Sequence, residues 1–510
     1  MENIIILDCG SQFTQLIARR VRELGVHSEI LPWDAEEGRI RAGNPVGVII
    51  SGGPQSVTEP DAPDIDDVVF SLDVPVLGIC YGMQLMTRKF DGRVSSGASR
   101  EYGRMRIGRR PRPSHLLDGL PDSFEVWMSH GDHVDRIPEG FELLAETEGQ
   151  VPAVMVDEGR ALYGLQFHPE VAHTQHGNDI LSNFLFRICG CKGDWDLGDW
   201  VDRMVREISQ TVGDGRVLCA LSGGVDSTVA AVLTSKAVGD RLSCVFVDNG
   251  LLRLDEAASV LNGYSKLDLN VRSVDASERF LSALRGVSDP ERKRKIIGET
   301  FIRVFEAEAS SVQDAQWLLQ GTLYPDIIES GHKGKSASVI KSHHNVGGLP
   351  ENMRFEVLEP LRDLFKDEVR KIGALLGIPS SILTRKPFPG PGLAVRCLGD
   401  VTRERLDALR KADAICTDEL SLWEGYASVW QAFCVLLPVR TVGVMGDSRT
   451  YSEAAVVRAV ESSDGMTADW VRIPYDILDR IARRICNEVP DINRVALDIT
   501  SKPPATIEWE

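Results

Sequence analysis

Hydrophobic residues in the N-terminal part of the chain fall into short, uninterrupted runs with polar stretches between them. The clearest runs cover residues 4–7, 46–50 and 74–79, and each leads into a turn of Gly, Ser or Cys. Uninterrupted runs of this length, rich in β-branched residues, are typical of strands buried on both faces of a parallel sheet. The pattern therefore predicts a doubly wound α/β domain at the start of the chain.

A second α/β unit begins near residue 217. Residues 217–221 form an apolar run, a Gly-rich turn follows, residues 228–238 have helical character, and residues 243–247 form the next apolar run. A strand–helix–strand unit of this kind pairs its strands in parallel. The sequence thus predicts a second doubly wound parallel-sheet domain.

Two breaks divide the chain. The first is the polar, Gly-containing segment 191–198, and the second is segment 386–392, whose closely spaced prolines exclude a regular helix. A length of 510 residues suggests roughly three domains of about 150 residues each. We therefore predict domains over residues 1–191, 199–386 and 387–510, the last being a smaller α+β domain.

The composition narrows the classes of function. Hydrophobic residues make up 43% and charged residues 26% of the chain, as in soluble globular proteins. The 57 Lys and Arg against 75 Asp and Glu give a net charge of −18, which argues against general nucleic-acid binding because that affinity comes from basic surface. Ten cysteines without a CxxC pair indicate a reducing compartment. No segment resembles a signal peptide or a membrane span, so we expect a cytoplasmic protein without membrane contact.

A cysteine at the end of a predicted strand is the first candidate for chemistry. Residues 78–82, Gly-Ile-Cys-Tyr-Gly, have the strand-to-helix elbow pattern of G-x-S-x-G, with the thiol of Cys80 in the place of the hydroxyl. Glycines suit a tight turn with positive φ, and a helix beginning near Met83 favours the thiolate. A buried structural cysteine is the alternative that this segment alone leaves open.

A histidine and a carboxylate can serve this thiol. His168 can take the thiol proton and return it to a departing amine, and Glu170, two residues on, can fix the tautomer of the ring. Such a pair is common by chance. The Ser-Gly-Gly-Pro turn of residues 51–54 follows a predicted strand and exposes backbone N–H groups that can hold an oxyanion, although a plain tight turn has the same sequence.

Together and in this order, these segments closely resemble a class I glutamine amidotransferase over the first predicted domain. The resemblance implies Cys80 as nucleophile, His168 as general base and Glu170 as the group that orients it, with a glutamyl thioester as intermediate. It also implies five residues that contact glutamine, the first two through backbone amides at the oxyanion: Gly53, Tyr81, Gln84, Ser129 and His130.

The second α/β unit begins with a loop suited to an anion. Residues 222–228 follow a predicted strand and open a helix, so backbone N–H groups and the helix dipole meet there. The loop lacks the Lys of a Walker A motif. It resembles the pyrophosphate loop of the ATP pyrophosphatase family, which cleaves ATP between the α- and β-phosphates. A plain βα turn is the alternative interpretation. The resemblance implies these ATP-binding residues: Ser222, Gly223, Gly224, Val225, Asp226, Ser227 and Thr228.

Two other polar segments have open interpretations. Residues 291–295, Glu-Arg-Lys-Arg-Lys, form a basic run that is commonly a solvated helix face but can close over phosphates as a mobile lid. His343 and His344 resemble a metal site, yet adjacent histidines point apart on a helix or strand and no third ligand lies near. We expect no stable transition-metal site there.

The remaining motifs extend the resemblance to the whole chain. Residues 321–326, 341–348, 388–392 and 501–510, together with the two domains, resemble the glutamine-hydrolysing GMP synthetase family. The resemblance implies a ligase that converts XMP, ATP, glutamine and water to GMP, AMP, pyrophosphate and glutamate through an adenyl-XMP intermediate. It also implies Mg²⁺, whose ligands are unknown, a homodimer formed by the C-terminal domain, and these XMP-binding residues: Arg294, Lys502, Ile507 and Glu508.

Two other functions compete with this one. A glutamine-dependent NAD synthetase would use the same ATP chemistry on another acceptor, but that family generally has a nitrilase-like glutaminase. A non-catalytic nucleotide-binding regulator would not need the intact Cys80, His168, Glu170 and phosphate loop. Release of pyrophosphate with XMP or with deamido-NAD distinguishes all three.

Overall fold

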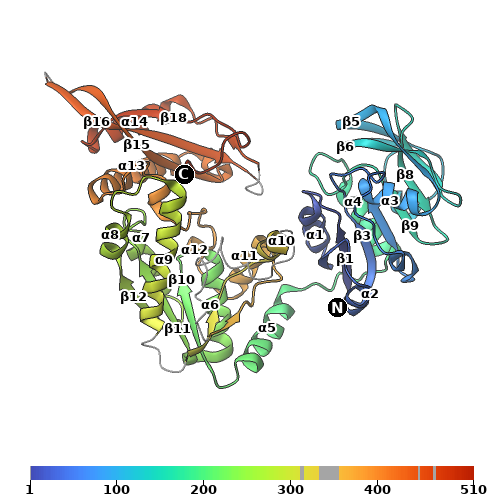
Figure 1. Ribbon diagram of the computed structural model, residues 1–510, viewed down its shortest axis with the longest axis horizontal. Helices are drawn as coiled ribbons and strands as arrows, with labels where there is room; N and C mark the ends of the chain where they lie inside the picture. Colours follow the sequence, from blue (N-terminus) through green and yellow to red (C-terminus); the bar gives the residue numbers. More distant parts are fainter. Residues whose placement is uncertain (1, 310–314, 332–354, 446–447, 463–466) are drawn as a thin grey trace. The chain divides into compact units, whose positions relative to one another are not determined.

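The computed structural model describes residues 2–309, 315–331, 355–445, 448–462 and 467–510. The chain packs into two compact units, Met1–Asp196 and Leu197–Glu510, and each is described by itself (Figure 1). The three domain ranges expected from the sequence stay predictions. Among the described residues, no helix is both long enough and apolar enough to cross a membrane.

The first unit is built on one nine-stranded sheet with the order β2-β1-β3-β4-β9-β8-β7-β5-β6. The first five strands in this order pair in parallel, and the remaining pairs are antiparallel. The strands are β1 (Asn3–Asp8), β2 (His27–Pro32), β3 (Pro45–Ile50), β4 (Val76–Ile79), β5 (Arg93–Arg109), β6 (Ser123–Arg136), β7 (Glu142–Thr147), β8 (Pro152–Asp157) and β9 (Leu162–Leu165).

The parallel half of this sheet confirms the predicted strands. The apolar runs 4–7 and 46–50 lie in β1 and β3, and the last four residues of the run 74–79 form β4. The side chains of residues 4–7 are fully buried. The apolar runs did not predict the antiparallel half. In β6, buried residues alternate with half-exposed ones, so the strand has no continuous apolar run. Helices of this unit include α1 (Thr14–Glu23), α2 (Glu37–Ala42), α3 (Tyr81–Lys89) and α4 (Gly177–Ser182).

The second unit contains a five-stranded sheet with the order β12-β11-β10-β13-β14, and every pair in it is parallel. The strand at residues 216–221, the helix at 225–238 and the strand at 242–248 confirm the predicted strand–helix–strand unit. The strands are β10 (Arg216–Leu221), β11 (Leu242–Asp248), β12 (Val271–Asp275), β13 (Ala315–Leu319) and β14 (Glu356–Leu358). The helices are α5 (Leu197–Val212), α6 (Val225–Val238), α7 (Glu256–Tyr264), α8 (Ser277–Leu284), α9 (Pro290–Ala309), α10 (Tyr324–Gly331), α11 (Lys366–Leu375) and α12 (Ser380–Leu383).

The end of the second unit forms a smaller α+β layer, as predicted (Figure 1). Its helices α13 (Arg403–Ser421) and α14 (Tyr475–Glu488) pack on a sheet of β15 (Gln431–Met445), β16 (Ser448–Glu461), β17 (Asp469–Trp470) and β18 (Ile492–Leu497). One hydrophobic core continues from β10 and β11 through α9 to α13, α14 and this sheet. The two sheets of the second unit therefore share a core.

Candidate active site

Cys80 lies at the elbow between β4 and α3. Its backbone has φ +51°, a left-handed conformation that a non-glycine residue adopts only under constraint, and its N–H donates to the Leu165 carbonyl over 2.6 Å. The residue is 5% exposed. Helix α3 begins at the next residue, so the positive end of the helix dipole lies beside Cys80.

The glycines on either side allow this elbow to form. A Cβ atom on Gly78 would lie 2.6 Å from the carbonyl carbon of Gly82, and one on Gly82 would lie 2.5 Å from the Ile50 carbonyl oxygen. Both distances are shorter than any real Cβ contact with backbone. The Gly-x-Cys-x-Gly pattern is therefore a steric requirement of the close packing of β3, β4 and α3.

His168 and Glu170 follow β9 and form a buried pair. The Nδ1 atom of His168 lies 2.7 Å from Oε1 of Glu170, the two residues are 3% and 1% exposed, and Phe13 packs edge-on against the ring. Burial opposes a charged ring, but the Glu170 carboxylate and the Cys80 sulfur outweigh it and raise the pKa of His168 to about 10. A pKa raised in this way favours the imidazolium, so the ring can hold the proton that the Cys80 thiol gives up.

The predicted oxyanion residues lie next to each other. A Cβ on Gly53 would lie 3.2 Å from Cγ of Tyr81, and a Cβ on Gly52 would lie 3.1 Å from Cε1 of His168. The turn after β3 therefore packs against both the start of α3 and the histidine ring. Tyr81 is the first residue of α3, where backbone N–H groups have no partner within the helix.

Of the predicted glutamine-binding residues, Ser129 contacts the sulfur, and Gln84 and His130 lie against other polar groups of the same unit. The Cys80 thiol donates to the Ser129 carbonyl over 3.8 Å, and Nε2 of Gln84 donates to the Asp132 carbonyl over 2.8 Å. His130 is buried with its Nε2 atom 3.3 Å from Oε2 of Glu101. Burial of Glu101 disfavours its charge, yet His130 and the Thr147 hydroxyl hold its pKa below the ordinary value.

The predicted phosphate loop connects β10 to α6. Gly223 has φ +78°, and Gly224 is the N-cap of the helix. The hydroxyls of Ser222 and Ser227 lie 3.1 Å apart, and Thr228 donates its hydroxyl proton to the Gly224 carbonyl over 2.7 Å. These contacts close the loop on itself and leave a helix N-terminus at its opening, which is an arrangement that binds anions.

The basic run 291–295 begins helix α9. Lys293 is fully buried and donates to the Cys397 carbonyl over 2.9 Å, and it also pairs with the Glu510 carboxylate. A solvated helix face is therefore the wrong interpretation for this residue, while a lid stays a prediction. Arg294 donates to the Glu510 carbonyl, so the run contacts the last residue of the chain.

The C-terminal tail is held by two fully buried arginines. Arg396 donates to both carboxylate oxygens of Glu508, over 3.0 and 2.8 Å, and stacks on Phe433. Arg458 donates to the Ile507 carbonyl over 2.7 Å and pairs with Asp498 over the same distance. The predicted XMP residues Ile507 and Glu508 are thereby fixed in position.

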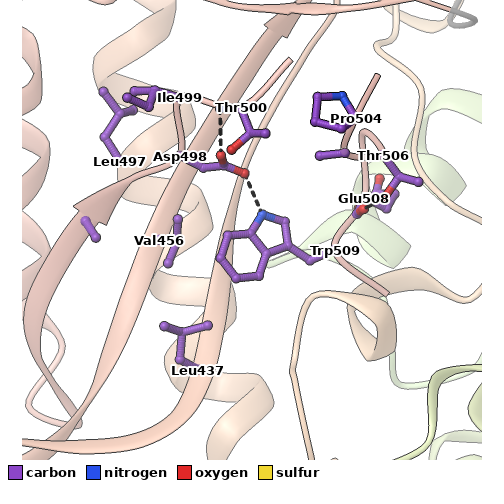
Figure 2. A pocket seen from close by; sticks show the side chains of 12 residues that line it. Leu437, Val456, Leu497, Asp498, Ile499, Thr500, Pro504, Thr506, Glu508 and Trp509 are labelled. Carbon is purple, nitrogen blue, oxygen red and sulfur yellow. Dashed lines mark hydrogen bonds between the residues drawn. The ribbon is translucent and has the colours of Figure 1, made fainter. Parts of the chain in front are cut away.

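A cavity of about 760 Å³ lies between the tail and the C-terminal sheet (Figure 2). Glu508 and Trp509 are among its lining residues, and Trp509 donates from Nε1 to Asp498 over 2.9 Å. Lys502 is placed by a backbone bridge to Ala468. The predicted motif 341–348, with His343 and His344, lies outside the described residues.

Family models and curated relatives match this chain. The model for glutamine amidotransferase class-I matches residues 5–188, and the model for the GMP synthase C terminal domain matches residues 418–509. The GMP synthase (glutamine-hydrolyzing) of Aquifex aeolicus is 56% identical over 508 residues, covering 99% of both chains. Proteins of the same name from Caldicellulosiruptor saccharolyticus and Symbiobacterium thermophilum are also 56% identical, covering 100% and 99% of this chain and 99% of each relative.

This chain belongs to the glutamine-hydrolysing GMP synthase family. The family resemblance and the fold class predicted from the sequence are thereby confirmed. Relatives match nearly the whole chain, so the glutaminase half and the nucleotide half are both included in the match.

Two cationic side chains lie beside the phosphate loop and were not among the ATP-binding residues predicted from the sequence. Arg385 donates to the Gly223 carbonyl over 2.8 Å and pairs with Glu256 over 2.6 Å. Lys366 lies 3.3 Å from Oδ2 of Asp226. Neither residue is near the loop in sequence, so spacing gave no signal, although Arg385 directly precedes the Pro-rich segment. The motif 321–326, by contrast, was part of the family resemblance, and a Cβ on its first glycine would lie 3.1 Å from the backbone of Asp226.

Proposed function

We propose that this chain makes GMP from XMP in two coupled half-reactions, one that releases ammonia from glutamine and one that activates XMP with ATP. The sum is XMP, ATP, glutamine and water giving GMP, AMP, pyrophosphate and glutamate. The buried Cys80–His168–Glu170 arrangement supports the first half. The full-length similarity to GMP synthases supports the second half and the identity of the acceptor.

In the glutaminase half, the Cys80 thiolate attacks the side-chain carbonyl of glutamine. The amides of Gly53 and Tyr81 stabilise the resulting oxyanion, and the His168 imidazolium gives its proton to the departing nitrogen, so ammonia and a thioester form. Water, deprotonated by His168, then attacks the thioester, and the products are glutamate and regenerated Cys80. Glu170 orients the ring and keeps it charged.

In the nucleotide half, residues 222–228 hold the pyrophosphate part of ATP at the N-terminus of α6. A carbonyl oxygen of XMP attacks the α-phosphorus, and pyrophosphate leaves. Ammonia then attacks the activated carbon and displaces AMP, which is a much better leaving group than an oxide. Arg385 donates to the carbonyl of Gly223, the loop glycine that has positive φ, and so holds the backbone of the loop.

A magnesium ion fits the same loop. The Oδ1 atom of Asp226 is buried without a hydrogen-bond partner, and a carboxylate oxygen is a ligand that Mg²⁺ prefers, the others being phosphates and water. Bound with ATP, the ion would neutralise charge on the departing pyrophosphate. Asp226 is therefore the residue of this loop that would hold it, with Lys366 beside its second oxygen.

The XMP site is proposed to lie where the tail meets α9, with contacts from Arg294, Lys502, Ile507 and Glu508. The position of Arg294 at the Glu510 carbonyl supports this, because the lid residue and the tail already touch. Pairing of the Glu508 carboxylate with Arg396 places the tail backbone, and it also means that Glu508 acts on XMP with a charge that is partly compensated.

A homodimer is proposed to form through the C-terminal layer. The β15–β16 hairpin places Val442 directly opposite Tyr451, with Val444 two residues further on the same face. These side chains are 52%, 59% and 74% exposed. A contiguous apolar stripe of this kind marks an interaction surface, and the occupant that we propose is the same hairpin of a second copy.

The test is a product analysis of the purified chain with ATP, Mg²⁺ and glutamine. We expect GMP, AMP and glutamate in equal amounts with XMP and no amidated product with deamido-NAD. Amination of deamido-NAD would show that XMP is not the acceptor. Binding of nucleotides without any release of AMP would show that the chain is a regulator and not a ligase.

A further inference from the structure

Gln166 is a buried side chain that the mechanism above does not use. It follows β9 directly, its backbone N–H donates to the Ala153 carbonyl over 2.9 Å, and it is fully buried. Its side-chain Nε2 donates to the sulfur of Cys80 over 3.8 Å. A polar amide in the interior has to be hydrogen-bonded, and one of the bonds of this amide goes to the reacting atom.

The direction of this hydrogen bond is fixed by its neighbours. A backbone carbonyl can only accept, so the atom of Gln84 that lies 2.8 Å from the Asp132 carbonyl is its amide nitrogen. That same nitrogen donates to Oε1 of Gln166 over 3.4 Å. The oxygen of the Gln166 amide therefore faces Gln84, and its N–H group faces the sulfur.

A donor at this position is needed once the thiol is ionised. The thiol proton points to the Ser129 carbonyl over 3.8 Å, and after the proton has left, that carbonyl dipole faces a negative sulfur and repels it. The positive charge of the His168 imidazolium stabilises the negative sulfur from the side of the ring. The side-chain N–H of Gln166, just after β9, offsets the repulsion from the carbonyl by donating to the negative sulfur. A hydrogen bond to a charged acceptor is about twice as strong as one between neutral groups.

We infer that Gln166 is a further catalytic residue of the glutaminase site, which stabilises the Cys80 thiolate by hydrogen bonding, both as nucleophile and as leaving group when the thioester is hydrolysed. The inference rests on the proposed role of Cys80. Gln84 is the positioning residue that orients the Gln166 amide, in addition to its proposed contact with glutamine.

The first test is Gln166→Met, which keeps the length of the side chain and removes the donor. Loss of one hydrogen bond to a charged group lowers kcat/KM for glutamine-dependent GMP synthesis by roughly 10- to 100-fold. Alkylation of Cys80 by iodoacetamide, followed by mass spectrometry of its peptide, is expected to slow at pH 7, and the pH of its half-maximal rate to rise. Synthesis from an ammonium salt is expected to be unchanged.

Gln175→Met is the matched control. Gln175 is exposed in the same unit, and its side chain accepts from the Glu125 N–H, so the same chemical change is made away from the sulfur. This control is expected to match the unsubstituted chain in both alkylation and synthesis. Gln166→Asn, which withdraws the donor by one methylene, replaces Gln166→Met if that variant melts earlier than the control.

The outcomes separate this inference from the proposed function. Wild-type alkylation of Cys80 in Gln166→Met, with or without loss of glutamine-dependent synthesis, overturns the inference, because a residue that only packs or binds glutamine leaves the thiolate unaffected. Retention of glutamine-dependent synthesis in Cys80→Ala instead overturns the proposed function. Slow alkylation and slow glutamine use together, with normal use of ammonium, support the inference.

Discussion

At the level of single residues, the proposed glutaminase chemistry depends most on the positive charge of the His168 ring. The ring is buried, and without the Glu170 carboxylate 2.7 Å away, burial would favour its neutral form. Its pKa is raised from 6.5 to about 10, so the folded chain keeps a proton there that the unfolded chain loses near neutral pH. The stability that this pair contributes is full below about pH 6.5 and is lost as pH rises toward 10.

Glu170→Gln tests this charge through the pH dependence of stability. The amide cannot stabilise the imidazolium, so we expect the unsubstituted chain to be more stable than the variant at pH 6.5 and the difference to shrink steadily toward pH 10. Melting of both proteins across this range measures it. A difference that is constant with pH contradicts the charged pair. Glutamine-dependent synthesis is expected to fall less than in Cys80→Ala, because the nucleophile is still present.

Some site residues could be predicted from the sequence and others could not. The elbow at Cys80 was predictable because it needs glycines on both sides. His168 and Glu170 were assigned only through the resemblance of several segments taken together, because a His and a Glu two residues apart are common by chance. Gln166 and Arg385 were missed for a physical reason. Their partners are 86 and 162 positions away, and contacts made by the folded sheet leave no periodicity or spacing in the chain.

In the proposed mechanism, synthesis from glutamine and synthesis from ammonium both depend on the loop between β10 and α6. Gly223→Ala adds a Cβ 3.2 Å from Val260 at φ +78°, at a cost of about 1–2 kcal/mol, and displaces the amides that approach phosphate. We expect GMP formation from glutamine and from ammonium to fall together. Gly377→Ala is the control, since it has φ +77° and open space around the added Cβ. Normal use of ammonium by Gly223→Ala contradicts the role of the loop.

The C-terminal tail is an element held by buried charge. Arg458→Met removes a fully buried guanidinium that binds Asp498 and the carbonyls of Thr506 and Ile507. Breaking a buried pair costs about 3–5 kcal/mol, so we expect a large loss of stability in urea and a raised KM for XMP with either nitrogen source. Arg483→Met, at a surface pair, is expected to change stability by less than ~0.5 kcal/mol. Unchanged stability and KM in Arg458→Met contradict the account of the tail.

Elements differ in how far the sequence predicts them. The parallel strands β1, β3, β4, β10 and β11 were predictable because burial on both faces requires continuous apolar runs. The strands β5 and β6 of the first unit were not, because one face is half-exposed and their residues alternate. Their pairing nevertheless shapes the site, since Ser129 of β6 accepts from the Cys80 thiol and His130 of β6 lies beside Glu101 of β5.

At the scale of the whole molecule, the apolar stripe of the β15–β16 hairpin predicts assembly. Val444→Asp places a charge where the proposed dimer buries an exposed valine, so we expect sedimentation to change from dimer to monomer. Tyr475→Asp, at an exposed position of α14, is the control and is expected to leave the dimer intact. A dimer that persists in Val444→Asp, or a chain that is monomeric without substitution, contradicts the proposed interface.

In the proposed function, ammonia is released by the first unit and used by the second, each with its own residues. Cys80→Ala tests it most directly, because the change removes the nucleophile with little change in volume, and the phosphate loop lies in the second unit. GMP is followed by absorbance with glutamine and then with an ammonium salt at a pH where some NH₃ is present. With glutamine we expect almost no synthesis and no glutamate. With ammonium we expect near-normal synthesis and release of AMP and pyrophosphate. Synthesis from glutamine, or loss of both activities in a folded variant, would contradict the proposed function.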